Sequence, residues 1–140
     1  MADNSIDYYE NLAREDLTCP KNGASLDISG YAVRLGLIRA KWARFLYDEN
    51  VIMQEAEQDL ETIYKDKFMF FTYDSEYTVD RKDIPMLIKA DDEYQKANKI
   101  VKQQSEKVKF INEVLSALNS QSFYLNTAMK HILWQSGETV

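Results

Sequence analysis

"ISGYAVRLGLIRAKWARF", residues 28–45, shows the helical pattern that dominates this chain. Its large apolar residues recur at alternating steps of three and four: Ile28, Tyr31, Leu35, Ile38, Trp42 and Phe45. This seven-residue repeat places the side chains on one face of a helix. The series resumes with Ile52, Ala56 and Ile63, so we predict one long helix over residues 27–63.

A second apolar stripe with the same spacing follows Pro85. It comprises Leu87, Ala90, Tyr94, Ala97, Val101, Val108, Ile111, Leu115, Leu118, Leu125, Met129 and Ile132, with only Gln104 and Ser122 polar on it. Asp83 suits an N-cap and Pro85 a first helical turn, so we predict a helix over residues 84–134. Its weakest point is "NSQS" at 119–122. No glycine and no proline except Pro85 lie between Leu37 and Ser136, which is typical of helical chains.

The remaining segments predict a short helix near Ser5–Glu15, a loop through "TCPKNGAS" and an aromatic connection. Strand formers at 68–73 and 77–79 flank "DSE", which favours a short β-hairpin. The predicted fold is mainly α: two long heptad-patterned antiparallel helices joined by a short aromatic β-hairpin or loop. We expect a single domain with an N-terminal helix and loop (1–26), a helical hairpin (27–134) and a tail (135–140).

Apolar residues also lie off both stripes. They are Val33, Leu37, Leu46, Val51 and Leu60 in the first helix and Ile88, Ile100, Phe110, Val114, Leu133 and Trp134 in the second. This surplus predicts self-association, with Phe110, Val114, Leu133 and Trp134 as the interface. The alternative is a compact monomer in which the helices break and fold back.

Composition indicates a soluble protein of 140 residues with a formal charge of −6. No apolar run is long enough to span a membrane, so no membrane association is expected. The acidic start "MADNSIDYYENLARED" does not match a signal or transit peptide. Cys19 is the only cysteine, which fits a reducing cytoplasm.

No catalytic pattern is present. His131 is the only histidine, and the glycines do not have the spacing of a phosphate-binding loop. The carboxylates at 55–61 and 91–93 are expected to lie on solvent-exposed helix surfaces and not to bind a metal. We therefore expect no enzyme activity, no metal site and no cofactor.

"YKDKFMFFTYDSEYTVD", residues 64–80, combines lysines with aromatic residues. Lysines pair with phosphates and bases stack on rings, so the stretch resembles a single-strand nucleic-acid site. On a strand, Lys65 and Lys67 share one face. The candidate DNA-binding residues are Lys65, Lys67, Phe70, Phe71 and Tyr73, with Lys99, Lys102 and Lys109 as secondary candidates. The alternative is a hairpin that only packs its aromatic rings on the helix ends.

The chain resembles the UvsY family of phage recombination mediators. The resemblance rests on the order of "AKW" (40–42), "YKDKFMFF" (64–71), "VDRKDI" (79–84), "LIKADDEY" (87–94), "LSAL" (115–118) and "MKHI" (129–132). It covers roughly residues 28–134.

The resemblance implies a non-enzymatic accessory protein. Such proteins form ring-shaped homo-oligomers, bind single-stranded DNA and help load a phage RecA-like recombinase onto strands covered by the phage single-strand-binding protein. The setting would be the host cell cytoplasm. The family's two basic DNA-binding positions correspond to Lys65 and Lys67, where this chain departs by a lysine at the second position, Asp66 as spacer, and "TYDSEY" with Asp74 and Glu76 in place of a glycine-rich loop. A ring would repeat each weak site. The alternative function is a structural or chaperone-like helical homo-oligomer without nucleic-acid binding.

Overall fold

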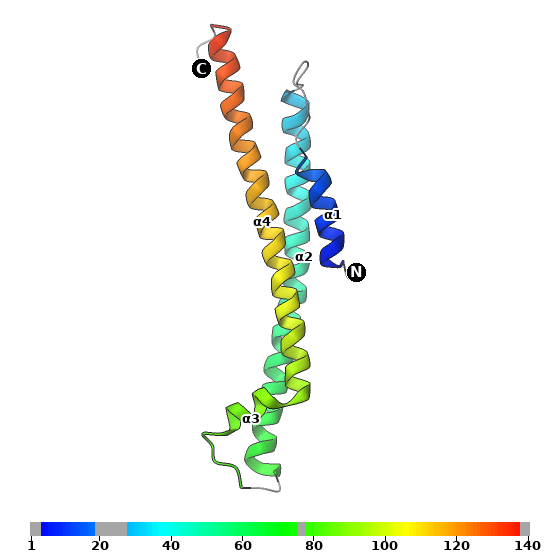
Figure 1. Ribbon diagram of the computed structural model, residues 1–140, viewed down its shortest axis with the longest axis vertical. Coiled ribbons are helices and arrows are strands. Elements are labelled where there is room, and N and C mark those ends of the chain that lie inside the picture. The colour runs from blue at the N-terminus through cyan, green and yellow to red at the C-terminus, as the bar shows by residue number, and fades with distance from the viewer. Residues whose placement is uncertain (1–3, 19–27, 76–77, 138–140) are drawn as a thin grey trace. The chain divides into compact units, whose positions relative to one another are not determined.

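The computed structural model describes residues 4–18, 28–75 and 78–137, and in these ranges the chain is helical without a strand (Figure 1). The mainly α prediction is confirmed. In chain order, the elements are α1 (Ile6–Asp16), α2 (Ile28–Met69), the π-helical turn η2 (Phe70–Asp74), α3 (Ile84–Ala90) and α4 (Asp92–Gln135). The predicted loop at 18–25 lies almost entirely outside the described residues.

The N-terminal helix α1 begins at Ile6, one residue after the predicted start at Ser5. The backbone N–H of Tyr8 donates to Ser5 Oγ at 3.3 Å, which satisfies one of the free donors of the first turn. Tyr9 and Ala13, four residues apart, are buried. The cap and this apolar pair explain why so short a segment is helical: it is held by packing more than by its own propensity.

The predicted β-hairpin is wrong. Helix α2 continues to Met69, and the aromatic residues Phe70–Asp74 extend it as η2. Once a helix is formed, each added residue gains one hydrogen bond without a new nucleation step, and this outweighs the strand preference of single residues. The chain leaves the helix at Ser75, and Thr78–Asp80 are not in a strand.

The second predicted helix is broken at Asp91, not at "NSQS". Asp91 is extended (φ −70°, ψ 135°) and its carboxylate accepts from the backbone N–H of Tyr94 at 3.1 Å, so it caps α4. Because α3 is a separate helix, the expected start of the stripe at Leu87 is also wrong, although Ile111, Leu118 and Leu125 of the same stripe are buried. Leu87 is exposed, and Ile84 and Ile88 are buried instead.

The "NSQS" segment stays helical because Gln121 is used in tertiary hydrogen bonds. Its side chain accepts from the Tyr31 hydroxyl at 3.1 Å and donates to the Leu17 carbonyl at 2.9 Å. Gln121 thereby connects α4 with α2 and with the end of α1.

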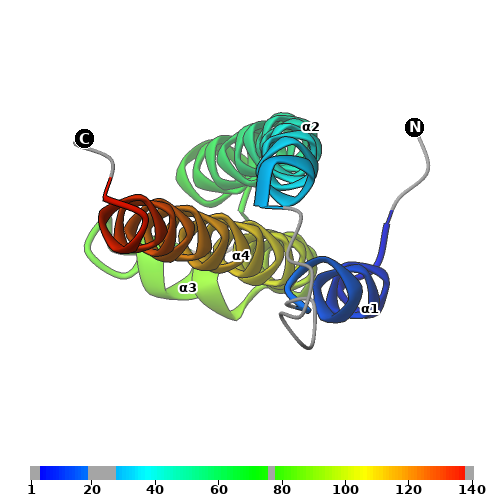
Figure 2. The same ribbon diagram turned by 90° about the horizontal axis from the view of Figure 1, so that it is seen from above.

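The chain forms two compact units: unit 1 (residues 1–47 and 109–140) and unit 2 (residues 48–108). In unit 1, α1 packs against the N-terminal part of α2 and the C-terminal part of α4, around Tyr9, Ala13, Leu35, Trp42, Ile111, Val114, Leu118 and Leu125. Figure 2 shows the three helices of this unit from above. The stripe residue Trp42 is fully buried, and its indole N–H donates to Asp16 Oδ2 at 2.8 Å.

Unit 2 contains a buried polar layer where the two long helices pair. Glu49 is 2% exposed and Gln104 is 6% exposed. The Gln104 amide donates to the Glu49 carbonyl at 2.9 Å and to its carboxylate, and Lys107 Nζ lies 3.5 Å from the same carboxylate. The helices run antiparallel here, since Glu49 meets Gln104 while Tyr64 meets Tyr94. Gln104, the one polar residue of the stripe in this unit, therefore makes a hydrogen-bonded contact between the two helices.

Candidate nucleic-acid interface

Lys65 and Lys67 lie near the end of α2, not on a strand. Residues two apart on a helix differ by about 200° in direction, so the two lysines point to opposite sides. The expectation that they share one face is therefore wrong. Lys65 is exposed and pairs with Glu61 one turn earlier, at 3.2 Å. Such exposed pairs contribute less than about 1 kcal/mol, so a phosphate can replace Glu61 at little cost.

Lys67 is held by carboxylates of unit 2. Its Nζ lies 3.1 Å from Glu93 and 3.5 Å from Asp91, and its side chain is 26% exposed. The hydrogen bond to Glu93 raises the pKa of Lys67 above its ordinary value; the two negative charges add to this and partial burial opposes it. Lys67 is therefore protonated at neutral pH, but its charge is already neutralised within the protein.

A small cleft of about 200 Å³ joins Lys67 to the aromatic stretch. Its lining consists of Ile63, Asp66, Lys67, Phe70 and Glu93. The cleft thus brings together one candidate lysine and one candidate ring, but it also holds two carboxylates. A strand of DNA entering it would meet Lys67 only after displacing Glu93.

The candidate aromatic residues differ in exposure. Phe70 is 48% exposed and Tyr73 is 73% exposed, whereas Phe71 is half-buried. The rings of Phe70 and Phe71 meet edge to face with centroids 5.3 Å apart. Phe70 and Tyr73 therefore expose ring surface that a ligand could contact, and the Phe71 ring packs edge to face against Phe70.

The secondary lysines are on α4. Lys99 and Lys102 are exposed in unit 2, and Lys109 is exposed in unit 1. Lys107, in the same run of sequence, is instead half-buried against Glu49. The run is therefore divided between a structural lysine and solvent-exposed ones.

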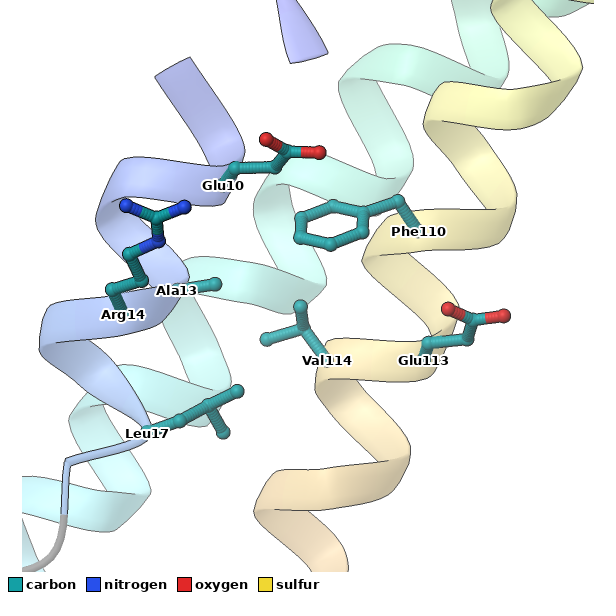
Figure 3. A pocket seen from close by; sticks show the side chains of 7 residues that line it. All are labelled: Glu10, Ala13, Arg14, Leu17, Phe110, Glu113 and Val114. Atoms are coloured by element: carbon teal, nitrogen blue, oxygen red, sulfur yellow. The ribbon is translucent and has the colours of Figure 1, made fainter. Parts of the chain in front are cut away.

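The residues predicted to form the oligomer interface fall into two groups in unit 1. Val114 is buried in the core and Phe110 is half-buried beside it. Both line a groove of about 440 Å³ between α1 and α4, with Ala13 and Leu17 on its floor and charged residues at its edge (Figure 3). Near the C-terminus, Leu133 is half-buried and Trp134 is 74% exposed. The His131 ring stacks on the Trp134 indole, with the ring centroids 6.3 Å apart.

Sequence reasoning missed the carboxylates that compete for the lysines. The Glu61–Lys65 spacing of four is a helical ion-pair signal that the sequence contains. The pairing of Lys67 with Asp91 and Glu93 has no such signal, since 24 or more residues separate the partners. Within the described residues, no cluster of three or more His, Cys, Asp or Glu side chains is arranged to hold a metal ion, and no helix has the length and apolar character to cross a membrane.

This helical fold is one found in phage recombination mediators. The chain is similar to the crystal structure of the bacteriophage T4 recombination mediator protein UvsY in lattice type IV, with a TM-score of 0.77, 14% identity, and coverage of 94% of this chain and 99% of that chain. For the structure in lattice type II the TM-score is 0.80 and the identity 12%, with 95% and 98% covered. A search of curated proteins gives no significant match.

The chain belongs to the UvsY family. The family model described as "Recombination, repair and ssDNA binding protein UvsY" matches residues 3–138, nearly the whole sequence.

Proposed function

We propose that this protein is a recombination mediator: it binds single-stranded DNA and helps to load a RecA-like recombinase onto strands covered by a single-strand-binding protein. The observation that carries the proposal is the family match over residues 3–138, together with a fold similar to the T4 mediator over 94% of the chain. Its place of action would be the cytoplasm of the host cell, with no cofactor, no catalytic step and no membrane partner.

The DNA contact in this proposal lies at the end of α2. Lys65 pairs with a phosphate in exchange for Glu61, while bases stack on the exposed rings of Phe70 and Tyr73. Lys67 contributes when a phosphate replaces Glu93 at its ammonium group. Lys99 and Lys102 are exposed on α4 in the same unit and extend the contact, and the exposed Lys109 of unit 1 is a separate secondary candidate.

Weak sites suit a mediator if they are repeated. Residues 48–108 carry nine Lys and Arg against fifteen Asp and Glu, so one copy of unit 2 attracts DNA poorly. In a ring-like homo-oligomer the same strand meets one site per subunit, and the effective concentration of the next site raises the overall affinity. A grip built from weak contacts also releases the strand to the recombinase. Trp134 and Leu133, with Phe110 and Val114 in the α1–α4 groove, are the proposed assembly residues.

The second candidate is a structural or chaperone-like helical homo-oligomer that does not bind nucleic acid. Its support is that Lys65 and Lys67 already have carboxylate partners. The two candidates differ in what the lysines do.

Fluorescence anisotropy with labelled single-stranded oligonucleotides, across a salt series, separates these functions. A mediator binds with an affinity that falls steeply with salt, and a double change of Lys65 and Lys67 to Ala reduces the slope by about 0.7 per lost phosphate contact. Changing the exposed Lys82 and Lys89 to Ala is the matched control. If the parent shows no salt-dependent binding, the second candidate is correct. If it binds and the double variant has the parent slope, the DNA site lies elsewhere, with Lys99, Lys102 and Lys109 next.

A further inference from the structure

The outward face of α2 in unit 1 is apolar along its centre and basic around it. From Ile28 to Tyr47 the sequence has four basic residues and no acidic one. Lys41 is paired with Asp16 at 2.6 Å, and the three arginines are exposed. We call this surface the basic face; it consists of Val33, Arg34, Leu37, Arg44 and Tyr47.

The apolar residues of the basic face are largely exposed to solvent. Val33, Leu37 and Tyr47 are 66%, 69% and 62% exposed. With 3.6 residues per turn they lie within about 80° of each other, opposite the buried Leu35 and Trp42. An amphipathic stripe of this kind is typical of a helix that packs on a second surface.

Gly36 lies at the edge of the same face. A glycine inside a helix costs roughly 0.8–1 kcal/mol relative to alanine. A Cβ placed on Gly36 would meet no atom within 4 Å, so packing inside this chain does not require the glycine. A glycine at this position would instead allow the backbone of another chain to approach the helix closely.

Unit 2 contains a surface with the complementary properties. A groove of about 270 Å³ between α2 and α4 has an apolar floor of Ala56, Ile63, Ala97 and Ile100. Asp59 and Glu93 lie at its rim, together with one lysine, Lys96. Residues 48–61 of α2 contain six acidic residues and no basic one. We call this surface the acidic groove.

We propose that the basic face of one copy docks on the acidic groove of another copy of this chain. Val33 and Leu37 would contact the apolar lining, and Arg34 and Arg44 would face Glu55 and Asp59, which lie one turn apart on α2 and are both exposed. The inference rests on the homo-oligomer of the proposed function and adds a second contact to the one proposed at Leu133 and Trp134. Since the two surfaces differ, each copy offers one of each, and a head-to-tail contact of this kind closes into a ring when the rotation permits.

A second copy fits the basic face better than DNA does. Val33 and Leu37 are aliphatic and offer no ring for a base to stack on. The one ring, Tyr47, is covered by the Arg44 guanidinium 5.3 Å from its centroid. Apolar side chains flanked by arginines match an apolar groove with a carboxylate rim.

Two charge-reversal variants test the contact. In one, Arg34 and Arg44 are changed to Glu; in the other, Glu55 and Asp59 are changed to Lys. In sedimentation equilibrium each variant alone should fall to the mass of a single chain, 16.3 kDa. An equal mixture should assemble again, because one variant supplies two acidic surfaces and the other two basic surfaces. Changing the exposed Lys82 and Lys89 to Glu is the control, which should retain the parent mass.

Circular dichroism of each variant checks that the helices form, and Gly36→Leu gives a test without any charge change. A Cβ added at Gly36 meets no atom within 4 Å in its own chain, so the fold should persist while the mass falls. Raising salt from about 0.1 M to about 1 M, which shortens the screening length from about 10 to about 3 Å, should also dissociate the parent.

The outcomes separate this contact from the proposed function. If the parent assembles and binds single strands but the reversal variants keep its mass, or their mixture stays monomeric, the docking surfaces are wrong and the function stands. If the arginine variant loses DNA binding at unchanged mass, the basic face is a nucleic-acid surface instead. A parent of 16.3 kDa at every concentration would overturn the contact and the homo-oligomer together.

Discussion

Lys67 is the residue where this chain's electrostatics and its proposed function compete. Two carboxylates, Glu93 at 3.1 Å and Asp91 at 3.5 Å, occupy the ammonium group that a phosphate would need. The raised pKa of Lys67 means that its stabilising charge is present at all pH values below its ordinary pKa and is lost only above the raised one. A change of pH near neutrality therefore does not alter the charge of Lys67. Whether a phosphate can contact Lys67 depends instead on Glu93 and Asp91, which already pair with it.

Changing Glu93 to Gln is expected to strengthen single-strand binding. One competing charge is removed while the side-chain shape is kept, so the affinity should rise severalfold. Anisotropy at fixed salt measures it. Glu106→Gln, an exposed acid on the same helix, is the control. If Glu93→Gln leaves affinity unchanged and lowers the melting temperature, Lys67 is a structural residue only.

Substitution of Tyr73 tests whether this ring stacks on DNA bases or packs within the protein. Tyr73 is 73% exposed, so Tyr73→Ala should change the free energy of unfolding by no more than about 0.5 kcal/mol. If bases stack on the ring, the same change should weaken single-strand binding by about 1–3 kcal/mol per base. Urea unfolding and anisotropy measure the two quantities. The control is Phe123→Ala, an equally exposed ring in unit 1, which should alter neither.

At the scale of elements, the pairing of α2 with α4 in unit 2 depends on a polar layer. Glu49 accepts from Gln104 and faces Lys107 in a site from which water is almost excluded. In a heptad stripe, a buried polar contact fixes the register of the helices at some cost in stability. The layer therefore sets which turns of α2 and α4 meet.

Removing Glu49 is expected to destabilise unit 2 strongly. Glu49→Ala leaves the half-buried Lys107 without this carboxylate, and breaking a pair with a buried partner costs up to about 3–5 kcal/mol. Glu49→Gln, which keeps the hydrogen bond to Gln104, should cost less. The measurement is the urea midpoint of unfolding, with the exposed Gln54→Ala as control. Equal midpoints for Glu49→Ala and the parent would mean that the layer carries no stability.

The connection between the long helices was the element that sequence reasoning misassigned. Local strand preference at Phe70–Tyr73 predicted a hairpin, but the helix before it simply continues. The break at Asp91 was also not evident from the sequence. Asp91 and Asp92 fit the acidic first turn of a helix, but this preference does not tell at which residue that helix begins. Only the capping bond to the Tyr94 N–H fixes the site.

For the whole molecule, assembly and DNA binding are expected to fail together. A chain ending at Met129 loses Leu133 and Trp134, so the oligomer should loosen, and single-strand binding should weaken because the sites no longer act on one strand. Sedimentation equilibrium and anisotropy on the same samples test this.

The matched control ends at Gln135, retaining α4 in full. It should behave as the parent in both measurements. A chain ending at Met129 that keeps the parent mass would exclude the C-terminal residues from the interface.

The two long helices could be predicted from residue spacing alone, since the three-and-four pattern of residues such as Leu35, Trp42, Ile111 and Leu118 places them on one face, and all four are buried. Residue type and proximity, which are local properties, also indicated Lys65 and its aromatic neighbours as candidates. The opposite directions of Lys65 and Lys67, and the pairing of Lys67 with Glu93, became evident only from the packed helices. Helix periodicity acts over a few residues, whereas an ion pair across two helices depends on the register in which distant segments pack.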